Sequence, residues 1–180
     1  MPEIEIRPAV PSDIPILIAL DHSTITDVVW QMEFRHQREP GQIDIHFQRV
    51  RLPRPVRQDY PKPVHSLAED WTRLSSLLVA SHADQVIGYI GLVLDRITQA
   101  VWVTDLAVKK SLRRKGIGSA LVLAAVEWSA NQESRDLVLE MHPKNGPGID
   151  FAFKMGFEFC GYNDFYYPVN KIGVFFRKSF

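Results

Sequence analysis

Residues 103–121 read VTDLAVKKSLRRKGIGSAL, a strand pattern followed by a glycine-containing turn and an apolar helical pattern that begins at Ile117. Valine-rich residues from 101 to 108 favour a buried strand. A helix N-terminus offers unpaired N–H groups and the positive end of the helix dipole, and glycines let the backbone approach an anion closely. The segment therefore predicts a strand, a phosphate-binding turn and a helix.

Two other phosphate-binding motifs do not fit these glycines. The dinucleotide fingerprint needs a third glycine where this chain has Leu121, and no run has the spacing of a P-loop. Three consecutive cations, Arg113, Arg114 and Lys115, would add attraction for a pyrophosphate. An ordinary strand–turn–helix with a solvated basic turn is the alternative interpretation.

The whole segment resembles the acyl-CoA-binding motif of the GNAT N-acetyltransferase family, Gln/Arg-x-x-Gly-x-Gly/Ala after a strand with an apolar-Ala-Val ending. Arg113, Gly116 and Gly118 fill the motif, and Leu106-Ala107-Val108 precedes it. A second segment, NGPGIDFAFKMGF at residues 145–157, is similar in spacing to the family's Asn-x-x-Ala-x-x-x-Tyr-x-x-x-Gly-Phe pattern. The resemblance covers roughly residues 79–180 well and the N-terminal part weakly.

Length and composition restrict the class of protein. A chain of 180 residues fits a single domain, here residues 1–180. The formal net charge of +0 provides no overall attraction to nucleic acid or membrane, and no apolar run is long enough to span a bilayer. The single cysteine and the absence of a signal-peptide pattern indicate a cytoplasmic protein. The six histidines lack metal-ligand spacing, so no metal site is predicted.

The order of patterns, together with the resemblance, implies an α/β (α+β) GNAT fold with a mixed, mostly antiparallel central sheet of about seven strands flanked by helices. Strands are predicted at residues 4–7, 77–80, 86–94, 100–108, 135–141, 157–162 and 172–177. Helices are predicted at 14–20, 27–34, 65–75, 117–130 and 147–155, and an aromatic loop at 164–168. In the family the first two helices border the acceptor pocket, which would bring Trp30, Met32 and Phe34 near it, although core packing is favoured for all three.

Residues 35–64 form an insertion atypical of the family, a basic and proline-rich arm. Residues 35–63 contain seven cations, three acids and five prolines. Apolar residues alternate from Ile43 to Phe47 and then change phase, which suggests a bulge or a strand–turn change. The arm could recognise an acidic acceptor, cover the acceptor site, pair with a second subunit, or form a solvated basic loop.

The resemblance also implies how acetyl-CoA is bound. The strand that ends at Val108 would part from the strand near Glu140, and the Leu106 N–H would donate to the thioester carbonyl. Backbone N–H groups of the turn would surround the pyrophosphate. The implied cofactor-binding residues are Leu106, Ala107, Val108, Arg113, Arg114, Lys115, Gly116, Ile117, Gly118, Ser119 and Asn145.

The catalytic side chains are less well specified. The family's usual general acid, a tyrosine, is replaced by Ala152. Tyr166 is a substitute, with Tyr167 and Tyr162 as further candidates. Asp105, on the strand beside the predicted cleft, is the first candidate for the general base, and Glu140 is the second. Each carboxylate could instead bond a nearby backbone group, and an ordered water chain could serve as the base.

These features predict an acetyl-CoA-dependent N-acetyltransferase that acts on a primary amine of a small molecule or of a protein or peptide, by direct attack in a ternary complex. The alternative, favoured by Ala152, is a non-catalytic or regulatory acyl-CoA-binding module. Binding of nucleic acid through the basic arm is a third hypothesis, and the neutral net charge counts against it. The acceptor and the acyl-chain preference are left open, and the long arm is compatible with a homodimer.

Overall fold

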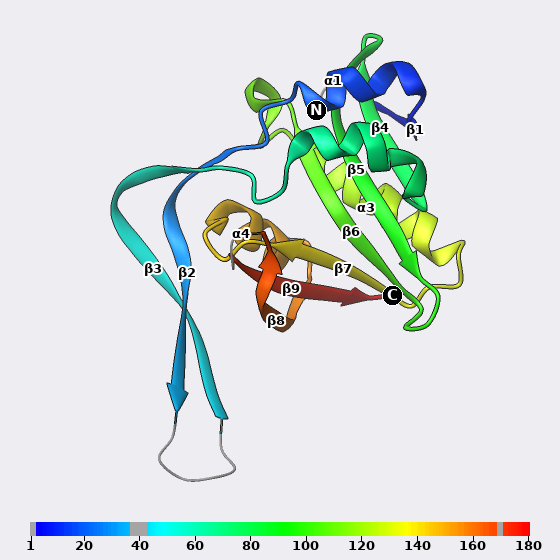
Figure 1. The fold of residues 1–180 in the computed structure, drawn as a ribbon. Coiled ribbons are helices and arrows are strands. Elements are labelled where there is room, and N and C mark those ends of the chain that lie inside the picture. The colour runs from blue at the N-terminus through cyan, green and yellow to red at the C-terminus, as the bar shows by residue number, and fades with distance from the viewer. Residues whose placement is uncertain (1–2, 37–42, 169–170) are drawn as a thin grey trace.

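The computed structural model describes residues 3–36, 43–168 and 171–180. Its main sheet has seven strands in the order β1-β4-β5-β6-β7-β9-β8 (Figure 1). The strand bounds are β1 Glu5–Pro8, β4 Ser76–His82, β5 Gln85–Asp95, β6 Ala100–Val108, β7 Asp136–Met141, β8 Glu158–Tyr167 and β9 Lys171–Ser179. Neighbouring strands are antiparallel except β6 and β7, which are parallel. The predicted mixed, mostly antiparallel sheet is therefore confirmed.

Helices cover both faces of this sheet. Helix α3 (Ile117–Ala130) and helix α4 (Gly146–Lys154) pack on one face, where Leu121, Val122 and Ile149 join sheet residues in the larger core cluster. Helices α1 (Ile14–Ile18) and α2 (Leu67–Asp70) pack on the other face. Short 3-10 turns flank them: η1 Pro11–Asp13, η2 Val64–Ser66 and η3 Trp71–Arg73, with η4 Lys110–Leu112 before α3. The predicted bounds of α3 are confirmed. The helix has apolar residues on nearly every side, as expected of a buried helix.

The helix predicted at residues 27–34 is wrong. This segment belongs to strand β2 (Thr24–His36), which pairs with β3 (Ile43–Gln58) in a separate two-stranded sheet. Val28, Val29 and Met32 have helical spacing, but the β-branched residues of the segment favour an extended strand once β3 provides a partner. Of the basic arm predicted at residues 35–64, residues 35–36 end β2, residues 43–58 form β3, residues 59–63 connect β3 to η2, and residues 37–42 lie outside the described residues.

The β2–β3 hairpin extends away from the main sheet beyond α4 (Figure 1). Its register shifts between Thr26 and Val28, opposite a segment that contains Pro53 and Pro55. Proline has no backbone N–H and cannot donate a hydrogen bond to a neighbouring strand, which explains the irregular pairing at this point. The middle of β2 is fixed to the body by a hydrogen bond from the backbone N–H of Trp30 to the Pro143 carbonyl at 2.9 Å.

The aromatic loop predicted at residues 164–168 is also wrong, because residues 164–167 continue strand β8. The β8–β9 pairing contains register shifts, one of them between Asn163 and Tyr167, and such shifts interrupt the alternation from which strands are predicted. Tyr166 and Tyr167 are thus held on the sheet. None of the helices within residues 3–36, 43–168 and 171–180 combines the length and apolar character that crossing a membrane requires.

Candidate active site

The two central strands separate halfway along their length. β6 and β7 are paired from Ala100 and Asp136 up to Val103 and Leu139, and the ladder ends there, although both strands continue. The N–H of Lys109 bonds the Ile87 carbonyl of β5. Because alternate residues of a strand turn their backbone groups to the same edge, Leu106 and Val108 turn theirs toward the gap, and Ala107 toward β5. The predicted parting of the strands is confirmed.

The turn before α3 has the backbone geometry of an anion cradle. Gly116 is the N-cap residue, with a φ of 88°, and Arg114 also has a positive φ, 67°. The left-handed region suits glycine, and successive N–H groups around such residues form a concavity that attracts anions. The helix begins without a side-chain cap, so its first N–H groups are available to a ligand. Ile117 is buried, whereas Gly118 and Ser119 line the cavity described below.

Arg113 performs a task that the sequence did not indicate. Its guanidinium donates to three backbone carbonyls, those of Val108 at 2.9 Å, Ser23 at 2.7 Å and Asp21. These bonds tie the turn to the segment that follows α1, which carries His22 into the site. The positive charge of Arg113 is not neutralised by these carbonyls, so its attraction for a pyrophosphate stays a prediction, as it does for the exposed Arg114 and Lys115.

Replacing Arg113 by methionine is expected to lower the free energy of unfolding by about 2–4 kcal/mol, because partly buried carbonyls would lose charged donors. Chemical denaturation monitored by circular dichroism measures the change. Arg114→Met is the matched control, since that side chain is exposed, and it should shift stability by no more than about 0.5 kcal/mol. Equal stabilities of the two variants would show that the three hydrogen bonds do not anchor the turn.

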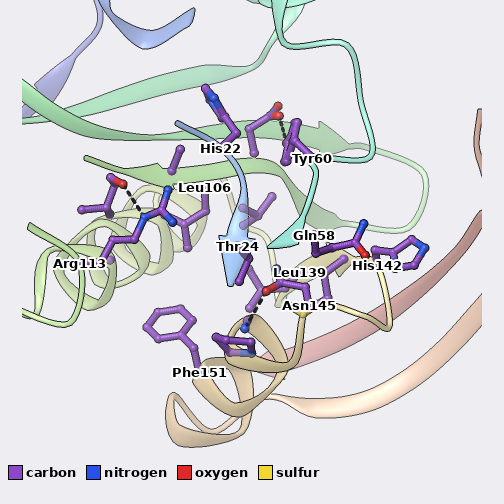
Figure 2. A pocket seen from close by; sticks show the side chains of 18 of the residues that line it. His22, Thr24, Gln58, Tyr60, Leu106, Arg113, Leu139, His142, Asn145 and Phe151 are labelled. Carbon is purple, nitrogen blue, oxygen red and sulfur yellow. Dashed lines mark hydrogen bonds between the residues drawn. The ribbon is translucent and has the colours of Figure 1, made fainter. Parts of the chain in front are cut away.

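The gap between β6 and β7 opens into a cavity of about 490 Å³ (Figure 2). Its walls come from the outer halves of β6 and β7, the turn and first residues of α3, the first two turns of α4, and the base of the β2–β3 hairpin. Figure 2 shows Arg113 at one end and Tyr60 at the other. The cavity is lined by every predicted cofactor residue except Lys115 and the buried Ile117.

Asp105 and Glu140 both line the cavity, and both are hydrogen-bonded to tyrosines. The Tyr60 hydroxyl donates to Asp105 Oδ1, and the Tyr166 hydroxyl donates to Glu140 Oε2. Burial is the main factor that raises the pKa of both tyrosines, and the neighbouring carboxylates raise it further. The structure therefore brings together the two predicted carboxylates, each with a protonated phenol.

A lysine from outside the motifs completes this cluster. Lys62 Nζ forms an ion pair with Glu140 Oε1 and donates to the Thr104 carbonyl. The Glu140 side chain is only 4% exposed, so this ion pair provides a counter-charge for a carboxylate that has little access to water. In the sequence, Lys62 is one of the seven cations of residues 35–63, with nothing local to distinguish it from the others.

His22 is a second residue that the sequence analysis missed. Its Nδ1 donates to the Leu20 carbonyl at 2.7 Å, because a carbonyl can only accept, and its Nε2 accepts from the Tyr89 hydroxyl at 2.9 Å. Burial lowers the pKa of His22. His22, Tyr60 and Lys62 lie far from β6 in the sequence, so no local pattern could have placed them in the site.

Asn145 lies at the mouth of the cavity as the N-cap residue of α4. Its Oδ1 accepts from the Gly148 N–H at 3.0 Å, which holds the amide at the start of α4. Ala152, which stands where the family has its usual acid, is 0% exposed and packs in the larger core cluster. The general acid cannot come from this position.

The aromatic candidates separate into two groups. Tyr60 and Tyr167 line the cavity, whereas Tyr166 contacts it only through Glu140, and Tyr162 packs against Phe47 with ring centroids 5.7 Å apart. Trp30 packs against Phe153 at 5.7 Å, as the favoured core interpretation predicted. The side chain of Phe34 lies outside the described residues.

His142, at the end of β7, is expected to make stability depend on pH. Burial, followed by the charges of Lys144 and Lys171, lowers the pKa of His142 to about 4, from 6.5. The unfolded chain then binds a proton that the folded chain does not, so stability is lost as the pH falls from 6.5 towards 4. The expected loss is about 1–3 kcal/mol, after allowance for partial solvent screening.

Denaturation midpoints measured between pH 4 and pH 7 test this dependence. His142→Asn should flatten the curve, since an asparagine oxygen can still accept the Lys144 N–H that His142 Nδ1 accepts at 3.0 Å. His65→Asn, at an exposed position, is the control. An unchanged slope in His142→Asn would assign the acid sensitivity to other groups, including His22.

Comparisons with known proteins agree with this geometry. The model of the acetyltransferase (GNAT) family matches residues 44–157. The chain is 27% identical to streptothricin acetyltransferase of Streptomyces lavendulae over 162 residues, which cover 87% of this chain and 82% of that protein.

Solved structures show the same fold. Nourseothricin acetyltransferase superposes with a TM-score of 0.82 at 23% identity, covering 98% of both chains. A candidate streptothricin acetyltransferase of Bacillus anthracis, in complex with acetyl coenzyme A, superposes with a TM-score of 0.76 at 19% identity, covering 99% of this chain and 100% of that one. The family match spans more than half of the sequence, so the resemblance inferred from the two motifs is confirmed. The chain belongs to the GNAT family of acetyltransferases, and with that membership come the acyltransferase class and the use of acetyl-CoA.

Proposed function

We propose that this acetyltransferase transfers the acetyl group of acetyl-CoA to a primary amine of a small cationic molecule of the streptothricin type. The observation that carries the proposal is the pair of carboxylates, Asp105 and Glu140, that line the cavity where β6 and β7 part. An amine reaches such a site as an ammonium ion, which carboxylates attract and can deprotonate. The names of the curated relative and of the solved structures supply the acceptor class.

The cofactor half of the cavity would be built by backbone groups. The N–H groups from residue 113 to residue 119 would bind the pyrophosphate, with Arg114 and Lys115 as nearby charges. Leu106 and Val108 would pair with the pantetheine arm, and the Leu106 N–H would polarise the thioester carbonyl. The amide NH₂ of Asn145 would donate to the same arm. Acetyl-CoA supplies an activated acyl group, and the protein places it beside the amine.

Glu140 is the general base in this proposal and receives the proton of the acceptor amine. Tyr166 positions Glu140, since its hydroxyl bonds one carboxylate oxygen. Asp105, bonded to Tyr60, binds the second charge of a cationic acceptor or assists Glu140. Tyr167 and Tyr60 line the cavity and are the candidates to protonate the leaving thiolate, the task that Ala152 cannot perform.

The base of the β2–β3 hairpin favours a small acceptor over a protein. Residues from this region, including His22, Thr24 and Tyr60, form one wall of the cavity. Tyr60 and Pro61 line the same cavity as the two carboxylates, so an acceptor must fit between this segment and the strands β6 and β7. A compact amine meets this condition more readily than an extended polypeptide.

Thiol release from acetyl-CoA, measured with streptothricin and with a peptide bearing a free N-terminus and a lysine, tests the proposal. We expect release with streptothricin, and a product that carries one added acetyl group by mass spectrometry. Faster release with the peptide would overturn the small-molecule assignment. Binding of acetyl-CoA without thiol release on any amine would favour the alternative, a non-catalytic acyl-CoA-binding module. The buried Ala152 supports this alternative, because it replaces the family's usual general acid.

A further inference from the structure

Lys62 lies where an acceptor amine would have to lie. The segment after β3 carries its side chain to the point where β6 and β7 part, and there the ammonium contacts Glu140 of β7 and the Thr104 carbonyl of β6. The Lys62 side chain is 24% exposed, so it is held inside the fold rather than spread over the surface. A primary ammonium group of the chain itself therefore occupies the proposed acceptor subsite.

The position of this ammonium relative to the thioester follows from strand geometry. The β5–β6 register shifts at Thr104, so the direction of its carbonyl is given by its partner: Lys62 bonds both that carbonyl and Glu140 of β7, which places the carbonyl at the gap. Lys62 binds the carbonyl of Thr104 at this gap, and the Leu106 N–H is the proposed donor to the thioester carbonyl. Groups two residues apart on a strand are separated by about 6–7 Å, so the Lys62 amine must move from the Thr104 carbonyl toward Leu106 to reach the 3–3.5 Å of a near-attack arrangement.

A second cavity, of about 160 Å³, lies on the other side of Lys62. It is lined by Lys62, Leu67 and Asp70 and shares Tyr60, Thr104 and Asp105 with the larger cavity. Lys62 lines the smaller cavity and reaches the larger one through its ion pair with Glu140. This leaves room for the side chain to shift by one rotamer without disturbing the core.

We propose that Lys62 is a site of self-acetylation, an inference that rests on the proposed binding of acetyl-CoA at the β6–β7 gap. The Lys62 ammonium transfers one proton to the Glu140 carboxylate. The neutral amine then attacks the thioester carbonyl, a C–N bond forms and the C–S bond breaks. The attacking nitrogen loses its second proton to the leaving thiolate, so that CoA departs as the free thiol, and Glu140 returns its proton to solvent. The products are N-ε-acetyl-Lys62 and free CoA. The modification removes the positive charge of Lys62, so the ion pair with Glu140 is lost.

Peptide mass spectrometry tests this proposal directly. The full chain is incubated with acetyl-CoA and no acceptor, quenched at intervals and digested at aspartates, which releases the peptide of residues 59–69 with Lys62 as its single lysine. Lys109, which is exposed, reports the background of chemical acetylation by the cofactor. We expect Lys62 to be acetylated at least about tenfold faster than Lys109 despite its lower exposure, because the bound thioester is held next to it.

A second variant separates this reaction from chemical acetylation. Glu140→Gln should slow the acetylation of Lys62 about tenfold or more and leave that of Lys109 unchanged. The inference is overturned if Lys62 is modified no faster than Lys109, or at the same rate in Glu140→Gln. Thiol release with streptothricin, measured in parallel, separates the two proposals. Turnover of streptothricin with an unmodified Lys62 would contradict self-acetylation alone. A failure to bind acetyl-CoA would contradict both self-acetylation and the proposed function.

Discussion

Replacing Glu140 by glutamine is expected to lower the rate of amine acetylation about a hundredfold to a thousandfold while acetyl-CoA still binds with its original affinity. The glutamine keeps the shape of the side chain and an oxygen that can accept from Tyr166, while the ion pair with Lys62 is lost. It cannot accept a proton from an ammonium ion. The defect should therefore appear in kcat and leave the cofactor dissociation constant unchanged.

Two further variants make this result specific. Glu127→Gln removes a carboxylate from the exposed side of α3 and should have full activity. Asp105→Asn tests the other carboxylate, which was the first candidate for the base in the sequence analysis. A large loss of kcat in Asp105→Asn combined with full activity in Glu140→Gln would reverse the assignment of the base.

Replacing Gly118 by tryptophan is expected to weaken acetyl-CoA binding by at least about a hundredfold. A Cβ atom at this position would meet Phe151 at 3.8 Å and Val108 Cγ2 at 4.0 Å, which are ordinary contacts, so the backbone tolerates a side chain. The indole would then extend into the cavity where the pyrophosphate is proposed to bind. Calorimetric titration with acetyl-CoA, and separately with CoA, measures the loss.

Gly161→Trp is the matched control for this variant. A Cβ at Gly161 would also have its nearest contact at 3.8 Å, to Phe175, and this position on β8 does not line the cavity. Binding should be unchanged in this variant, and thermal denaturation of both proteins confirms that they are folded. Normal cofactor binding by Gly118→Trp would show that the turn before α3 is only structural.

The sequence predicted the strand, the turn and the helix start beside the cavity well, because these elements are encoded locally. The spacing of Gly116 and Gly118 indicates a turn followed by the start of a helix. The alternation of apolar and polar residues in 100–108 indicates the strand before them. Both features depend on neighbouring residues in the chain, so they can be read without knowledge of the rest of the fold.

The acceptor half could not be predicted in the same way. Tyr60 and Lys62 reach Asp105 and Glu140 across long separations in sequence, and the route depends on a hairpin whose first strand had the spacing of a helix. Pairing with β3 overrode that spacing, as tertiary partners commonly override local preference. Arg113 shows the same limit, since its charge was visible in the sequence but its three carbonyl partners were not.

A crystal structure of the protein with acetyl-CoA is the most direct test of the account. It should place the pyrophosphate on the N–H groups of residues 113–119 and the thioester carbonyl within hydrogen-bonding distance of the Leu106 N–H. The acetyl carbon should then lie beside Glu140, on the side of the gap where Lys62 is held. A cofactor bound elsewhere, or with its thioester away from the gap between β6 and β7, would contradict the proposed mechanism.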